Sequence, residues 1–164
     1  MAKVEISTVG DEIYYGMIQM PHYQGVQGSI CRLTRDWRIG LMLPDGRIFD
    51  ITIKANFSFD GASVPRALWR VCGHPLETPR IAAALVHDWL YAAHITTRAE
   101  ADLVYREILR AVGVSCVRRW TEYVTLRAAG EAAWRSHGAA DEQFALAHGV
   151  LAIDGQSQKG KNNE

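Results

Sequence analysis

The sequence predicts an α+β fold, in which an N-terminal antiparallel β-sheet is followed by a C-terminal half of three to four helices. Two patterns lead to this prediction. Aromatic and β-branched residues alternate with polar residues before about residue 60, and apolar residues follow a helical period after about residue 62. The length of 164 residues, with 48% hydrophobic and 22% charged residues, is that of one folded domain.

The predicted sheet covers about residues 4–60. Within it, Pro44, Asp45 and Gly46 have the composition of a tight turn between two strand-like runs. Residues 38–43 and 47–59 are therefore expected to pair as an antiparallel hairpin.

The predicted helices cover about residues 63–136. Ser63 followed by Pro65 has the pattern of an N-cap and a first-turn proline, which predicts a short helix ending near Val71. A second helix is expected over residues 79–93, because a threonine and a proline mark its start.

Two further helices follow in the prediction. Thr97 and Glu100 have the spacing of a capping box, so a third helix begins there and ends near Val112, before Gly113. The fourth covers residues 115–136. Its apolar side consists of Val117, Trp120, Val124 and Ala128.

The predicted elements belong to a single domain over residues 1–147, and the polar, glycine-rich residues 148–164 are expected to form a disordered tail.

Eighteen basic and eighteen acidic side chains cancel, so nucleic acid is not expected as a partner. Glu122 and Glu131 lie among the arginines of residues 115–136, which indicates a solvated helix face rather than a basic strip.

The cysteines and the hydropathy pattern favour a cytoplasmic protein. Cys31, Cys72 and Cys116 are far apart, which is typical neither of a zinc ribbon nor of a disulfide framework. We expect no membrane span, because no apolar run approaches the roughly 18 residues that one requires. The N-terminus also lacks the apolar core of a signal peptide.

His87 and Asp88 stand side by side in the apolar run of the second helix. At 3.6 residues per turn, His87 and Tyr91 share one face, whereas Asp88 lies about 100° around the helix. Asp102, with Arg98 one turn earlier, is expected to reach His87 from the third helix. Such a cluster is a catalytic site if it opens to solvent, with His87 as a base for water, and a structural polar network if it is sealed.

Other chemistry is also possible at these helices. Ser63 is a candidate nucleophile, although an N-cap role explains it equally well. Zinc is a second metal candidate, because His74, His87 and His94 could bind it together with Asp88.

The segments FSFDGASVPRALW, AALVHDWLYAAH and TRAEADLVYREILRAVGV carry three motifs. Together they resemble an uncharacterised family of small proteins encoded by bacteriophages and prophages. The resemblance covers about residues 47–114, and it implies a role in virion assembly, lysis or interference with the host. The expected partners are virion or host envelope components, in the host cytoplasm or in the virion. The matching residues are Asp60, Ala62, Ser63, Pro65, His87, Asp88, Tyr91, Arg98, Ala101 and Asp102.

The segment from His87 to Tyr91 is also similar to the His-Asp-x-x-Tyr helix of secreted calcium-dependent phospholipases. This resemblance implies that His87 activates water, Asp88 binds calcium, and Tyr91 supports an orienting Asp102. In those phospholipases a glycine-rich loop before the helix also binds calcium, and Asp60 is the candidate substitute for part of that loop. Ser63 and Arg98 are further candidates that would support the site.

The leading hypothesis from sequence is a phage accessory protein with a metal-assisted hydrolase site for an ester or amide of the cell envelope. Calcium is its first metal candidate. The alternative is a noncatalytic phage structural or host-interaction protein, in which the same cluster ties helices together.

Overall fold

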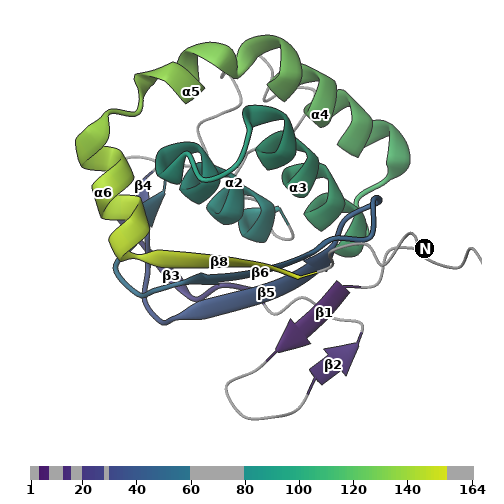
Figure 1. The fold of residues 1–164 in the computed structure, drawn as a ribbon, viewed down its shortest axis with the longest axis horizontal. Helices are drawn as coiled ribbons and strands as arrows, with labels where there is room; N and C mark the ends of the chain where they lie inside the picture. Colours follow the sequence, from purple (N-terminus) through teal and green to yellow (C-terminus); the bar gives the residue numbers. More distant parts are fainter. Residues whose placement is uncertain (1–3, 8–12, 16–19, 28–29, 60–79, 155–164) are drawn as a thin grey trace, which may run out of the picture.

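The computed structural model describes residues 4–7, 13–15, 20–27, 30–59 and 80–154, and these residues form two antiparallel sheets covered by helices (Figure 1). The predicted α+β class is confirmed. The short helix expected from Ser63 to Val71 lies outside the described residues.

The larger sheet has five strands in the order β2, β1, β5, β6, β8. Its β5–β6 hairpin matches the prediction, with Gly46 at a positive φ of 88° in the turn. Inward-facing residues of this hairpin, such as Ile39 and Ile51, are fully buried. The strands are β1 (Val4–Ser7), β2 (Ile13–Tyr15), β5 (Trp37–Met42), β6 (Ile48–Ile53) and β8 (Gly149–Asp154).

The second strand of the hairpin is shorter than predicted. It ends at Ile53, and the chain then turns through Asn56, whose φ is 72°. The following residues form β7 (Ser58–Phe59), which pairs with β4 (Ile30–Leu33) in a separate sheet that also contains β3 (Tyr23–Gln27). The alternating pattern therefore continues across a corner that joins two sheets.

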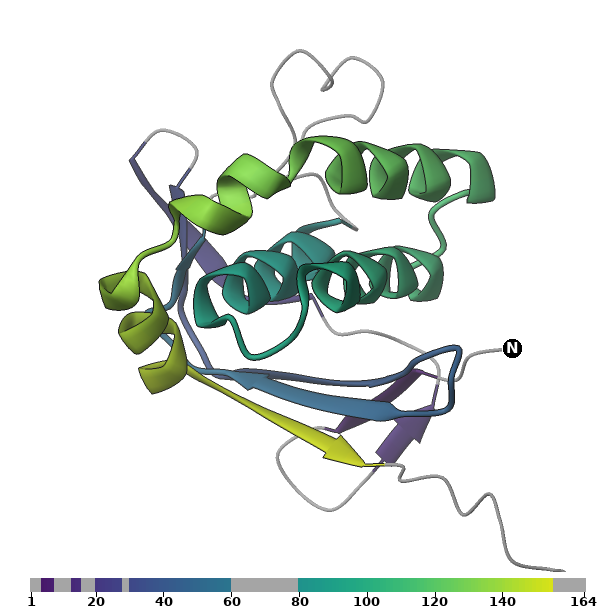
Figure 2. The same ribbon diagram turned by 45° about the horizontal axis from the view of Figure 1, so that its top comes forward.

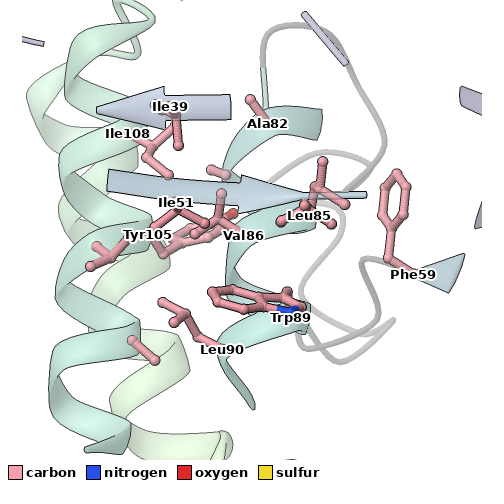
Figure 3. Packing of buried hydrophobic residues seen from close by; sticks show 14 of the residues in the cluster. Ile39, Ile51, Phe59, Ala82, Leu85, Val86, Trp89, Leu90, Tyr105 and Ile108 are labelled. Atoms are coloured by element: carbon pink, nitrogen blue, oxygen red, sulfur yellow. The ribbon is translucent and has the colours of Figure 1, made fainter. Parts of the chain in front are cut away.

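Helix α2 (Ile81–Ala93) lies at the centre of the molecule beside α3 (Arg98–Ala111), between the larger sheet and α4 (Cys116–Ala129) (Figure 2). Every residue of α2 except Asp88 is buried. Figure 3 shows its apolar side chains in one cluster with those of α3 and the sheet. The labelled members are Ile39, Ile51, Phe59, Ala82, Leu85, Val86, Trp89, Leu90, Tyr105 and Ile108.

The helix predicted over residues 115–136 is in fact two helices, α4 and α5 (Glu131–Ser136), separated by Gly130. A Cβ atom on Gly130 would lie 2.6 Å from the hydroxyl of Tyr91, so the chain approaches α2 too closely there for a larger residue. The apolar side predicted for α4 does not face the core, since Val117 is 79% exposed and Trp120 and Val124 are also exposed. Glu122 and Leu126 are the buried residues of this helix.

The tail predicted from residue 148 is wrong for residues 149–154, because they form β8 at an edge of the larger sheet. Helix α6 (Ala139–Ala147), which was not predicted, leads into this strand. The indole of Trp89 donates a 2.9 Å hydrogen bond to the carbonyl of Ala145, which fixes α6 against α2. Residues 155–164 lie outside the described part of the chain.

No helix in the described residues has the length and apolar character needed to cross a membrane.

Candidate functional site

A fully buried carboxylate, that of Asp102, lies at the centre of the predicted cluster. Its Oδ1 accepts hydrogen bonds from Tyr91 Oη at 2.7 Å and from His87 Nε2 at 3.0 Å. Its Oδ2 accepts one from Arg127 Nη1 at 2.8 Å, and Arg98 Nη1 lies 3.6 Å from the same oxygen. The expected approach of His87, Tyr91 and Arg98 to Asp102 is therefore observed.

Local sequence signals place these side chains. The predicted capping box is present, because the Thr97 hydroxyl accepts from the Glu100 backbone N–H and the Glu100 carboxylate accepts from the Thr97 N–H. His94 ends α2 with a left-handed φ of 50°, which lets the chain turn directly into α3. The two helices then lie side by side with His87 opposite Asp102.

The cluster is sealed from solvent. His87 is 1% exposed, and Tyr91 and Asp102 are not exposed at all. The imidazole packs against the Tyr91 ring in a tilted arrangement, with a centroid distance of 4.0 Å and an interplanar angle of 38°, and Tyr105 meets it edge-on at 5.4 Å. Aromatic rings therefore cover His87 where a catalytic base would need access to water and substrate.

The surroundings favour ionisation of both Asp102 and His87. Burial acts to raise the pKa of Asp102, but the hydrogen bonds from His87, Tyr91 and Arg127 outweigh it and hold this pKa below its usual value. Burial lowers the pKa of His87, whereas the nearby carboxylates of Asp102 and Asp88 raise it, and the net result is a raised pKa. Below the ordinary histidine pKa of 6.5, these two directions make the pair a buried imidazolium and carboxylate.

Asp88 differs from the rest of the predicted cluster because it reaches a cleft. Its side chain is 12% exposed, and its Oδ1 lies 3.9 Å from Nδ1 of His87, which is too long for a hydrogen bond. The cleft has a volume of about 440 Å³ and lies where β7, α2, α5 and α6 meet. Asp88 lines it, whereas His87, Tyr91 and Asp102 do not.

A second buried carboxylate, Glu122 of α4, was not predicted, because the arginines around it suggested a solvated helix face. Its Oε2 accepts a 2.8 Å hydrogen bond from Tyr105 of α3 and lies 2.9 Å from Arg80 Nη2, at the start of α2. Arg118 approaches the other oxygen at 3.3 Å. The i, i+4 spacing of Glu122 and Leu126 is the signal that could have identified the buried face of α4.

The remaining candidates are not brought to the cluster. Asp60, Ser63 and His74 lie outside the described residues. His94 faces away from it, because its Nε2 lies 3.1 Å from the carbonyl of Trp134 and its ring meets that indole edge-on. Among the residues that the structure describes, no group of three His, Cys, Asp or Glu side chains is arranged to hold a metal ion. Metal binding at Asp88 stays a prediction.

The fold and the site define an α+β protein in which the buried carboxylates of Asp102 and Glu122 join the helices beside a cleft that contains acidic and aromatic residues. Comparison with family models matches residues 41–126, slightly more than half of the chain, to a family described as a protein of unknown function, DUF1353. The chain belongs to this family. The prediction of an uncharacterised family is confirmed to that extent, and a phage origin stays a prediction.

One curated relative is the uncharacterized protein y4iH of Sinorhizobium fredii (strain NBRC 101917 / NGR234). It is 38% identical over 55 residues, a segment that covers 34% of the present chain and 23% of the relative. The chain therefore spans about a quarter of the length of that protein. No solved structure matches the chain.

Proposed function

We propose that this is a noncatalytic structural or host-interaction protein of a phage or prophage, which binds its partner at the cleft beside Asp88. The observation that carries the proposal is the 1% exposure of His87, since a base must reach water and substrate. In this proposal, the buried network fixes the helices that form the cleft wall.

The network around Glu122 supports a structural role for the network around Asp102. Both place a carboxylate between α2, α3 and α4, and both use a tyrosine hydroxyl and arginines as donors. The Glu122 network contains no histidine, so it cannot transfer a proton through an imidazole. Because the Asp102 and Glu122 networks are built in the same way, the best explanation is that both have the same structural role, which is to fix how the helices pack.

The phage origin and the nature of the partner rest on the sequence resemblance described above. His87, Asp88, Tyr91, Arg98 and Asp102 all match the phage pattern and all belong to the cluster or its immediate neighbours. A virion protein or a host envelope component remains the predicted partner.

A hydrolase is the second candidate function, and one observation favours it. Because Asp102 accepts from Nε2 of His87, the other ring nitrogen, Nδ1, is left on the side of Asp88, 3.9 Å from its Oδ1. This is the layout that the resemblance to calcium-dependent phospholipases implies, with Nδ1 taking a proton from water. The enzyme would require movement that uncovers His87.

The two candidates are separated by assays of wild type and His87→Ala with phospholipid, peptidoglycan and short acyl ester substrates, each with calcium, magnesium, manganese or zinc. We expect wild-type rates equal to those of buffer. We also expect that any rise in melting temperature caused by one of these metals is the same in wild type and in Asp88→Asn. Hydrolysis that is lost in a folded His87→Ala protein would instead establish the hydrolase. A calcium-dependent rise that is lost in Asp88→Asn would establish the calcium site that this hydrolase needs.

A further inference from the structure

Strand β8 is the outermost strand of the larger sheet (Figures 1 and 2). It pairs with β6 along one side over all six of its residues, and among the described residues no strand pairs with its other side. Val150 and Ile153, whose side chains point to opposite faces of the sheet, are 58% and 52% exposed. Exposure on both faces indicates that this edge of the sheet is open to solvent.

The features that usually protect an edge strand from pairing with other chains are absent from β8. Such strands commonly carry a proline, a lysine or a β-bulge. Strand β3, at an edge of the smaller sheet, has an irregularity of this kind, because its register shifts between Gly25 and Gln27. Strand β8 has the sequence GVLAID, without proline or lysine, and its register with β6 is continuous. It is therefore a regular strand with an unprotected edge.

The backbone groups of β8 point alternately toward β6 and toward the open edge. The N–H of Lys54 donates a 2.7 Å hydrogen bond to the carbonyl of His148, which therefore points toward β6. The N–H of Gly149 lies on the opposite side of the same peptide unit and points away from β6. By alternation along the strand, Gly149, Leu151 and Ile153 direct their N–H and C=O groups to the open edge. These groups are placed to pair with a further strand.

We propose that the open edge of β8 pairs with β8 of a second copy of this chain, antiparallel and around a two-fold axis, so that the two larger sheets become one. A second copy fits this edge because β8 is self-complementary. When Leu151 lies opposite Leu151 of the second copy, Gly149 lies opposite Ile153. In this register all three residues that face the edge form backbone hydrogen bonds. The dimer does not involve the cleft and is independent of the proposed function.

The side chains of β8 are compatible with this register. Val150 lies opposite Ala152 of the second copy on the outer face of the sheet, where both are exposed in the single chain. Asp154, the charged residue of the strand, lies toward His148 of the second copy and away from its own equivalent. The pairing therefore covers exposed apolar side chains without bringing like charges together.

Two measurements on the full chain test the dimer. Sedimentation equilibrium over about 5 to 500 μM, a range that covers moderate and weak self-association, should show a reversible equilibrium between monomer and dimer. NMR amide hydrogen exchange should locate the contact. Exchange at Gly149, Leu151 and Ile153 should slow about tenfold between mostly monomeric and mostly dimeric samples. The amides of Val150 and Ala152 face β6, so their exchange should be slow at every concentration.

Two variants of one residue separate backbone pairing from apolar contact. Ile153→Pro removes an N–H that faces the open edge, a position where an edge strand tolerates proline. Each copy then loses one backbone hydrogen bond to the other, so the dimer should weaken about thirtyfold. Ile153→Thr is the control, because threonine keeps the N–H and the β-branched shape but removes apolar surface. Its dimer should stay within about fivefold of wild type.

The proposal is overturned by any of three results. A chain that is monomeric at every concentration would leave the edge for a strand of a different protein. A dimer whose formation does not slow exchange at Leu151 and Ile153 would place the contact on another surface. Equal weakening by Ile153→Thr and by folded Ile153→Pro would show that apolar contact, and not strand pairing, holds the dimer. The exchange measurement needs no variant, so it decides the proposal even if Ile153→Pro does not fold.

Discussion

Replacement of Asp102 by asparagine is expected to lower the free energy of unfolding by about 3 kcal/mol, a loss typical of breaking a buried ion pair from one side. The native carboxylate accepts from His87, Tyr91 and Arg127. An asparagine oxygen can replace only part of these bonds, and its NH2 group would face donors rather than acceptors. Depending on how the amide is turned, either Arg127 or the buried hydroxyl and imidazole would face the NH2 group and lose their acceptor, which is costly at a buried site.

Urea denaturation at pH 7 measures this loss, and Asp50→Asn is the matched control. Asp50 also accepts from an arginine, Arg38, but this pair lies on the exposed surface of the β5–β6 hairpin. The control should lose less than about 1 kcal/mol. Similar small losses in Asp102→Asn and Asp50→Asn would show that the buried Asp102 network contributes no more to stability than an exposed ion pair.

Replacement of Gly149 by alanine is expected to cost about 3 kcal/mol, the upper part of the usual range for overpacking a core. An added Cβ would lie 2.3 Å from two atoms of the Trp89 indole. The indole is fully buried and held by its hydrogen bond to Ala145, so it cannot move aside without breaking that bond. The expected result is separation of β8 from the position it holds beside α2.

Thermal and urea unfolding test this expectation, with Gly138→Ala as control. Gly138 has extended backbone, and a Cβ atom added there would have no neighbour within 4 Å, so alanine should change stability by less than about 0.5 kcal/mol. A Gly149→Ala protein as stable as wild type would contradict the packing of β8 against Trp89.

The parts of the fold that sequence predicts well are those specified by neighbouring residues. The turn at Gly46 and the capping box of Thr97 and Glu100 depend on short-range backbone chemistry, and both are present. Strand β8 depends instead on pairing with β6, about a hundred residues earlier in the chain. Residues 150–153 are all apolar, but the polar, glycine-rich residues that follow them obscure this short strand signal. Gly149 is required by its contact with Trp89, which no local pattern reveals.

The same distinction applies to the site. Helical spacing places His87 and Tyr91 on one face and identifies Asp102 as their partner on the next helix. Arg127 could not be assigned in this way, because its approach to Asp102 depends on how α4 packs over α3. Likewise, the cleft at Asp88 requires α5 and α6, and helix α6 was not predicted.

His87 is expected to stabilise the fold as a buried imidazolium. The most direct test is the unfolding free energy of wild type and His87→Ala as a function of pH. The raised pKa of His87 means that its contribution is fully present below the unfolded value of about 6.5 and is lost as pH rises through the folded value.

At pH 6, where Asp102 is ionised, wild type should be about 2 kcal/mol more stable than His87→Ala, as expected for a buried hydrogen bond to a charged group. The difference should shrink at higher pH, and an exposed His22→Ala control should show almost none. Equal stability of wild type and His87→Ala at pH 6, or a difference that grows with pH, would contradict the structural role of His87.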